Sequence, residues 1–163
     1  MRILVLSDSH GKLAFMRRCI FRLKPDHVIH LGDHIDDGKV LETENPHIRF
    51  HMLPGNCDTF RFFGMEPDIL CYPIDDVMFF MTHGHRHGVK SSQEALIAQA
   101  RTKDARAALF GHTHIPVCRQ ETDGLWVINP GSCRDTLTAA LIQTQDGKIS
   151  ACTIVGQADI EGL

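Results

Sequence analysis

The 163-residue chain has no apolar run approaching the length of a membrane-spanning helix. Its first residues also lack the charged, apolar and small-residue regions of a signal peptide. Neither sign of charge is in large excess, because 17 Lys and Arg face 20 Asp and Glu, for a formal net charge of −3. These absences predict one soluble domain over residues 1–163 in the cytoplasm, with no membrane partner and no indication of nucleic acid from its charge.

Paired cysteines are absent as well. Six cysteines occur singly, without a CxxC pair: Cys19, Cys57, Cys71, Cys118, Cys133 and Cys152. Disulfide frameworks belong mainly to small secreted domains, so reduced thiols are expected. A structural zinc knuckle is disfavoured, because no two cysteines have the spacing of zinc ligands.

The first third of the chain alternates short apolar runs with helical patterns. Strands are predicted at residues 2–6, 28–31 and 48–53, and a short helix around residues 39–44. An earlier helix is predicted from apolar residues at helical spacing, which are Leu13, Met16, Ile20 and Leu23. The alternation of strand and helix predicts parallel βαβ units.

The later part of the chain changes character. Further strands are predicted at residues 69–72, 77–81 and 107–110, with a helix that Ser91 or Ser92 caps and that runs to about Arg101. Four short strands follow, at residues 117–120, 125–128, 137–143 and 149–155. The pairs Asp123-Gly124 and Asp146-Gly147 between them are hairpin signals. The last third therefore predicts a second, largely antiparallel sheet.

Polar clusters stand directly after five of the predicted strands. They are Asp8-Ser9-His10, Gly32-Asp33, Gly55-Asn56-Cys57-Asp58, Thr82-His83-Gly84-His85 and Gly111-His112-Thr113-His114. Glycine and aspartate are common turn formers, but turn formation does not explain histidines and aspartates in matching positions. Because ligand sites of open α/β sheets lie outside the carboxyl ends of the strands, the pattern predicts one shared metal site.

The spacing within two clusters suits metal ligation. Asp8 and His10 are two residues apart, as are His112 and His114. In an extended segment such side chains point to the same side, where both could bind one cation. Either pair alone is weak, because a turn-forming Asp beside a solvated His is common.

Taken together, the five clusters resemble the motifs of the calcineurin-like metallophosphoesterases. They occur in that family's order, as D-x-H, G-D, G-N-x-D, H-G-H and G-H-T-H. The compact length is similar to that of the small bacterial and archaeal phosphodiesterases of the superfamily. The resemblance implies an α/β fold, a four-layer αββα sandwich of two mixed β-sheets flanked by helices.

The resemblance also implies a role for each matching residue. Asp8, His10 and His114 would hold a first metal, Asp33 would bridge, and Asn56, His83 and His112 would complete a second site. Mixed nitrogen and oxygen ligation suits two divalent transition-metal ions, with Mn favoured and Ni, Fe, Co or Zn as alternatives. The implied activity is hydrolysis of a small phosphodiester by in-line attack of a metal-bridging hydroxide. The catalytic candidates are Asp33, Asn56, Cys57 and Asp58.

Cys57 is a departure from the family's pattern. Many members carry His at this position, where it resembles a general acid for the leaving oxygen. A thiol of ordinary pKa is a poor replacement, so substrates with good leaving groups are expected. In the alternative interpretation Cys57 is a small turn residue without a catalytic role.

Several residues near the motifs keep two interpretations. His34, His85, His87 and Arg134 could line the site, although solvated loop positions are more common for them. The stretch Asn129-Pro130-Gly131-Ser132 predicts a tight structural turn near the site. The aromatic run Phe60-Arg61-Phe62-Phe63 indicates core packing, or a patch that receives a substrate ring or another subunit.

Two other functions remain open on the sequence. A non-catalytic scaffold of the same fold, such as one retromer subunit, would lose metal ligands, whereas this chain keeps all seven proposed positions. A phosphoprotein phosphatase is the third alternative. The natural substrate and the oligomeric state, which could be a homo-oligomer, are not fixed by any motif.

Overall fold

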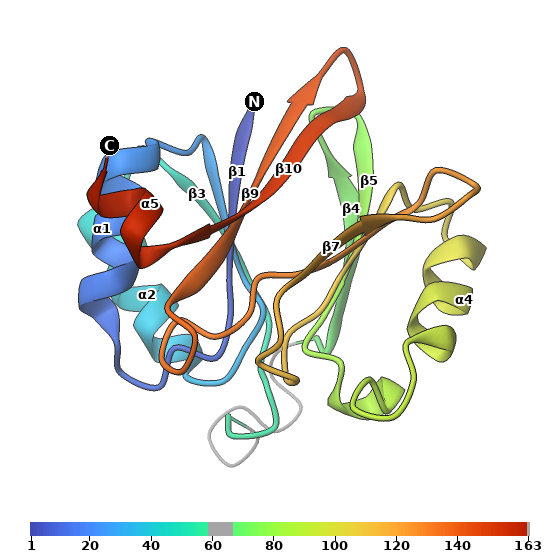
Figure 1. Ribbon diagram of the computed structural model, residues 1–163, viewed down its shortest axis with the longest axis horizontal. Coiled ribbons are helices and arrows are strands. Elements are labelled where there is room, and N and C mark those ends of the chain that lie inside the picture. Colours follow the sequence, from blue (N-terminus) through green and yellow to red (C-terminus); the bar gives the residue numbers. More distant parts are fainter. Residues whose placement is uncertain (59–66, 163) are drawn as a thin grey trace.

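Two five-stranded β-sheets form the centre of the computed structural model, which describes residues 1–58 and 67–162 (Figure 1). The predicted aromatic run at residues 60–63 lies outside the described residues. In the first sheet the strand order is β10 (Lys148–Gly156), β9 (Thr138–Gln145), β1 (Arg2–Leu6), β2 (His27–His30) and β3 (Arg49–Met52). In the second sheet it is β4 (Ile69–Ile74), β5 (Val77–Thr82), β6 (Ala107–Leu109), β8 (Trp126–Asn129) and β7 (Val117–Gln120).

Both sheets are mixed. The pairs β1–β2, β2–β3, β5–β6 and β6–β8 are parallel, whereas β1–β9, β9–β10, β4–β5 and β7–β8 are antiparallel. The parallel strands β1, β2 and β3 confirm the predicted βαβ units. They also send the carboxyl ends of these three strands to one edge of the first sheet.

Helices cover the outer face of each sheet. The helices α1 (Leu13–Leu23), α2 (Ile35–Glu44) and α5 (Gln157–Glu161) lie on the first sheet, and α4 (Glu94–Thr102) lies on the second (Figure 1). A short 3₁₀ helix, η1 (His85–His87), precedes α4. The layers run helix, sheet, sheet, helix, which confirms the four-layer sandwich.

Side chains of alternate strand residues enter different cores. On β1, Ile3 and Val5 pack between the two sheets, while Leu4 and Leu6 pack against the helices. On β5, Phe79 enters the core between the sheets, and its neighbour Phe80 packs towards α4. Because both faces of these strands are buried, their sequences are apolar throughout rather than alternating.

The prediction of a second sheet built from the last third of the chain was wrong. The two hairpins form as predicted, β7 with β8 and β9 with β10. However, the first hairpin joins the second sheet through β8 on β6, and the second hairpin joins the first sheet through β9 on β1. The turn residues specify which two strands pair within a hairpin. Which sheet edge the hairpin then joins depends on the whole fold.

Two helix predictions also needed correction. Helix α2 begins at Ile35 rather than near Lys39, because the Asp58 carboxylate accepts hydrogen bonds from the backbone N–H groups of His34 and Ile35, at 2.9 and 3.1 Å. Because Asp58 lies in a distant loop, the residues around the start of α2 carry no sequence signal for this cap. The short helix α5 was not predicted; its Ile160 fills the core beneath α1.

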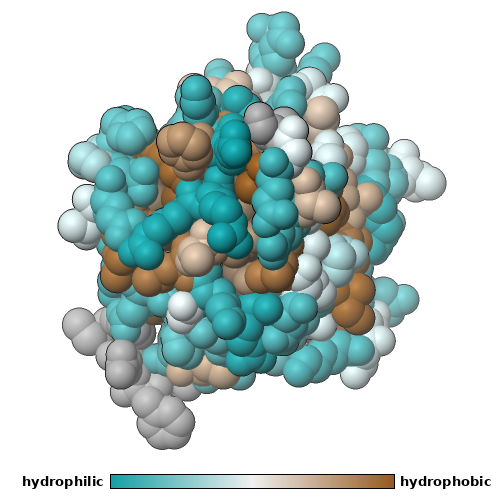
Figure 2. Space-filling model, turned by 60° about the vertical axis from the view of Figure 1, so that its left-hand side comes forward, coloured by the Kyte–Doolittle hydropathy of each residue, from teal (hydrophilic) through white to brown (hydrophobic). Residues whose placement is uncertain are grey.

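The side of the molecule that carries α1 and α5 is largely hydrophilic, with apolar side chains in small separate areas (Figure 2). Phe21 of α1 is the most exposed large apolar side chain of the described residues, at 74%. No helix among residues 1–58 and 67–162 is long and apolar enough to cross a lipid bilayer.

We predict that Gly32→Ala strongly destabilises the fold. Gly32 has φ +96°, and a Cβ there would lie 2.3 Å from the backbone nitrogen of Gly55 in the neighbouring loop. Strain and overlap together should lower the free energy of unfolding by roughly 3 kcal/mol or more. Denaturant titration measures the change.

Gly124→Ala is the matched control for backbone strain. Gly124 has φ +89°, but the nearest atom to its added Cβ is 3.9 Å away, so this variant should lose only about 1 kcal/mol. Equal losses in the two variants would contradict the close contact between the loops.

Candidate metal centre

The polar clusters follow strands whose carboxyl ends meet at one edge of the sandwich. Asp8 follows β1 and Asp33 follows β2, and the two loops are joined by hydrogen bonds from Asp8 N to Gly32 O and from Ser9 N to Asp33 O, at 3.0 and 3.3 Å. Asn56 follows β3 in the first sheet. From the second sheet, His83 follows β5, and the loop with His112 follows β6. Parallel pairing within each sheet therefore brings the distant motifs together.

Left-handed backbone conformations dominate these loops. Positive φ angles of 43–65° occur at five of the proposed ligands, which are Asp8, His10, Asp33, His112 and His114. The expectation that Asp8-x-His10 and His112-x-His114 are extended was therefore wrong. Non-glycine residues in this region cost free energy and concentrate at functional sites, where the surrounding structure holds them in place.

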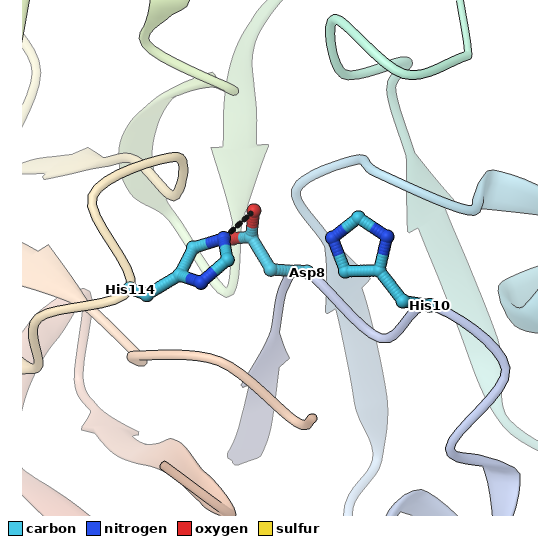
Figure 3. Close-up of side chains that lie close together, drawn as sticks. All are labelled: Asp8, His10 and His114. Atoms are coloured by element: carbon cyan, nitrogen blue, oxygen red, sulfur yellow. Dashed lines mark hydrogen bonds and ion pairs between the residues drawn. The ribbon is translucent and has the colours of Figure 1, made fainter. Parts of the chain in front are cut away.

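The first group of side chains is Asp8, His10 and His114 (Figure 3). One ligand atom from each lies within 4.8 Å of the others, and the two rings stand on opposite sides of the Asp8 carboxylate in this view. The Nε2 atom of His114 is 3.0 Å from Asp8 Oδ1. The carboxylate of Asp8 is fully buried and also accepts a hydrogen bond from the backbone N–H of His112, at 3.1 Å.

The second group is Asp8, Asp33 and His83, all buried. The Nδ1 atom of His83 is 2.7 Å from the carbonyl oxygen of Leu31. Because a carbonyl only accepts, Nδ1 carries a proton, and Nε2 is the ring atom that could bind a metal. Nε2 faces Asn56 Oδ1 at 3.1 Å and Asp33 Oδ1 at 3.5 Å.

Imidazole nitrogens and carboxylate oxygens that face one another at close range are a sign of a cation site. The oxygens of Asp33 face both groups, since Oδ1 lies near His83 and Oδ2 lies 3.7 Å from His10 Nε2. The ring of His112 lies beside that of His83, with centroids 5.1 Å apart, and thus on the side of the second group. The donor set of carboxylate, amide and imidazole atoms fits divalent transition-metal ions.

The protonation states also suit cation binding. Burial lowers the pKa of His10, with the charge of Arg134 acting in the same direction. Burial lowers the pKa of His112 to about 4, reinforced by His83 and Lys90. Burial alone would raise the pKa of Asp33, but the charge of His83 and hydrogen bonds from Cys57 outweigh it, so this pKa is lowered. Neutral imidazoles and an ionised carboxylate are the forms that bind metals.

Asp135 is a residue of the centre that the sequence analysis missed. Its Oδ2 atom lies 2.6 Å from Nδ1 of His114, on the opposite side of the ring from Nε2, which faces Asp8. Arg134 donates two hydrogen bonds to the same carboxylate, at 2.6 and 3.2 Å. A carboxylate behind a ligating histidine fixes its tautomer and orientation. No motif marks Asp135, because only the fold brings it next to His114.

Two of the proposed catalytic residues lie at the rim of the centre. The backbone N–H of Cys57 donates to Asp33 Oδ1 at 2.9 Å, and its thiol is exposed. Burial and hydrogen bonding to Asp33 raise the pKa of that thiol to about 11. Both oxygens of Asp58 are used by backbone N–H groups, since Oδ2 accepts from Gly55 at 2.8 Å and Oδ1 caps α2. Asp58 therefore holds two loops in place and does not face the ligand atoms.

The stretch Asn129–Ser132 packs against the centre as a turn. The side-chain amide of Asn129 donates to the carbonyl of Gly111 and to the hydroxyl of Thr113, at 2.9 and 3.0 Å. The Ser132 hydroxyl donates to the carbonyl of Asp8, at 2.9 Å. The turn thus fixes loops of both sheets relative to each other.

The remaining candidate histidines lie at different distances from the centre. The ring of His34 packs on His10, and that of His85 packs on His83, with centroids 5.0 and 5.5 Å apart. His87 instead turns away, with Nε2 2.6 Å from Gln99 Oε1 on α4.

Comparison with known proteins agrees with this geometry. The profile of the Calcineurin-like phosphoesterase superfamily domain matches residues 1–147. A probable metallophosphoesterase of Mycoplasma pneumoniae is 32% identical, over 93% of this chain and 95% of the relative. A phosphodiesterase of Methanocaldococcus jannaschii is also 32% identical, over 85% of this chain and 87% of the relative.

Solved structures share the fold. A predicted phosphoesterase of Streptococcus pneumoniae aligns with a TM-score of 0.75 and 26% identity, over 96% of this chain and 90% of that chain. Vps29 of Entamoeba histolytica, solved in complex with zinc, aligns with a TM-score of 0.71 and 20% identity, over 95% and 98% of the two chains. The second likeness shows the fold alone. The profile match and the two sequence relatives carry the conclusion that the chain belongs to the calcineurin-like phosphoesterase superfamily.

Proposed function

We propose that the chain is a phosphodiesterase that depends on two divalent metal ions. The observation that carries this proposal is the convergence of ligand atoms at the centre, where His114 Nε2 faces Asp8 and His83 Nε2 faces Asn56 and Asp33. Acceptors on the Nδ1 side of both rings direct the Nε2 atoms towards the place that a cation would occupy. The phosphodiesterase relative in Methanocaldococcus jannaschii supports the reaction class.

The residues divide between two cation positions. Asp8, His10 and His114 would hold the first, and Asn56, His83 and His112 the second. Asp33 would bridge them, which suits a carboxylate whose two oxygens face His10 and His83 separately. Bound cations would supply Lewis-acid activation of the phosphoryl group and of water. Mn is our first choice for both positions, with Ni, Fe, Co or Zn as alternatives.

Water is the nucleophile that the side chains favour. The hydroxyl of Ser7 donates to Asp8, and that of Ser9 donates to Asp37 Oδ2 at 2.7 Å, so both are engaged away from a substrate. We therefore infer in-line displacement at phosphorus without a covalent enzyme intermediate. We also infer that Asp58 positions the loops of residues 33–35 and 55–58, in place of the catalytic role expected from its motif.

A catalytic role fits these atoms better than a scaffold role. Asp8 and His83 are fully buried among other polar atoms, an arrangement that is unfavourable without a cation. A protein that acts only as a scaffold would not require this arrangement. A small diester is favoured over a phosphoprotein on the chain's compact length. Direct comparison of an activated diester with a phosphopeptide decides between these two substrate classes.

Asp33→Asn should abolish most of the diesterase activity. The substitution keeps the volume but removes the charge that faces both groups, so kcat/KM for an activated aryl diester should fall about a thousandfold or more. Steady-state assays with Mn²⁺ measure it. His47→Ala, at an exposed histidine near α1, should retain full activity. A metal-loaded wild type without any diesterase activity would instead favour the scaffold.

Asp135→Ala should weaken metal binding at the first position. Loss of the acceptor behind His114 frees its ring and tautomer, which we expect to lower Mn²⁺ affinity by roughly 10–100-fold. Isothermal titration calorimetry measures the affinity directly. Asp123→Ala is the matched control, because Asp123 is also exposed and paired with an arginine, Arg101. Equal affinities in both variants would refute the orienting role of Asp135.

Cys57→His should change the dependence on the leaving group. A histidine at the rim could protonate poor leaving groups, so rates for alkyl esters should rise more than rates for nitrophenyl esters. A series of diesters with graded leaving groups measures the slope. Cys57→Phe supplies a ring without a proton donor and should not alter the slope. Unchanged relative rates across the series in Cys57→His would refute the proposed link between residue 57 and the dependence on the leaving group.

A further inference from the structure

A groove lies at the edge of the second sheet that β7 forms. Its volume is about 620 Å³, which suits a ligand of nucleoside size. The loop before α4 forms one wall, and β7 with the preceding loop forms the other. Thr113 and Ile115 line the groove and flank the proposed ligand His114 in the sequence, so one side of the groove belongs to the loop that carries this ligand.

The lining changes in character along the groove. Lys90 lines the groove, and its ammonium has no ion pair among residues 1–58 and 67–162. Further along, Val89 and Ile97 are buried beneath the surface, and Ile115 is 65% exposed at the edge.

The part of the groove around Arg119 is polar. Arg119 of β7 donates to Glu121 Oε1 at 2.9 Å and to Gln93 Oε1 at 2.7 Å, which ties the strand to the loop before α4. Its charge is thus already paired. Glu94 also lines the groove and adds a second carboxylate to that of Glu121.

We propose that this groove binds the alcohol moiety of the phosphodiester that stays attached to phosphorus, and that this moiety is a neutral, ring-bearing group of nucleoside size. The inference rests on the proposed function. Lys90 contacts a phosphoryl oxygen, and Ile115 packs on the ring. Glu94, Glu121 and Arg119 together leave a net negative charge that disfavours a further phosphate in this part of the groove. The polar edges from Ser91 and Thr113 suit a heterocycle with hydrogen-bonding groups better than an acyl chain.

Two diesters with the same leaving group test the proposal. Methyl p-nitrophenyl phosphate lacks the ring-bearing alcohol, whereas the p-nitrophenyl ester of thymidine 5′-phosphate carries it. Wild type with Mn²⁺ should prefer the thymidine ester by about tenfold or more in kcat/KM, mainly through KM. A ratio near one, or a further gain from adding a 3′-phosphate to the thymidine, would overturn the proposal.

Variants separate the two contacts. Ile115→Ser should reduce the preference about tenfold, because it lowers kcat/KM for the thymidine ester much more than for the methyl ester. Lys90→Ala should lower kcat/KM for both esters by the same factor, and Lys90→Arg should restore part of it. Phe21→Ser, at an exposed apolar residue on α1, is the control and should change neither value. An unchanged preference in Ile115→Ser would contradict the proposed packing.

A binding measurement separates this inference from the proposed function. Thymidine 5′-(methyl phosphate), added to the metal-free chain, should shift the methyl NMR signals of Val117 saturably. If neither ester is hydrolysed but these shifts occur, the phosphodiesterase proposal fails and the groove stands. If the methyl ester is hydrolysed without preference and no shift occurs, the groove proposal fails alone.

Discussion

The buried carboxylate of Asp8 is the constraint on which the centre depends. It is fully buried, it belongs to both groups of ligand atoms, and it faces Nε2 of His114. A buried charge is stable only when it is compensated, and the hydrogen bonds from Ser7 and His112 are its partial compensation within the chain. A cation between Asp8 and the imidazoles would complete it. The fold thus favours metal binding before any substrate arrives.

The loops around Asp8 store strain that the rest of the molecule holds in place. Left-handed conformations at Asp8, Asp33 and His112 would be unfavourable in isolated turns. The Asn129–Ser132 turn holds the loops that contain Asp8 and Gly111. Asp58 holds the loops of residues 33–35 and 55–58 by hydrogen bonds to their backbone N–H groups. Such preorganised geometry lets side chains bind cations without reordering, which is what a hydrolytic centre requires.

The sequence predicted much of the fold and the convergence of the polar clusters at one edge of the sandwich. Apolar runs located the strands, and polar clusters after them located the proposed ligands. Asp135 could not be predicted, because its role arises from a contact with His114 that only the folded chain creates. The start of α2 was misplaced for the same reason, since Asp58 caps it from another loop. The Asp-Gly hairpin signals likewise predicted which strands pair, but they do not predict which sheet each hairpin joins.

We propose that two cations share one centre, with Asp33 between them. Anomalous diffraction from Mn²⁺-soaked crystals would locate both cations. We predict two peaks per chain, one beside Asp8, His10 and His114 and the other beside Asn56 and His83, both in contact with Asp33. A single peak, or peaks outside these side chains, would contradict the account.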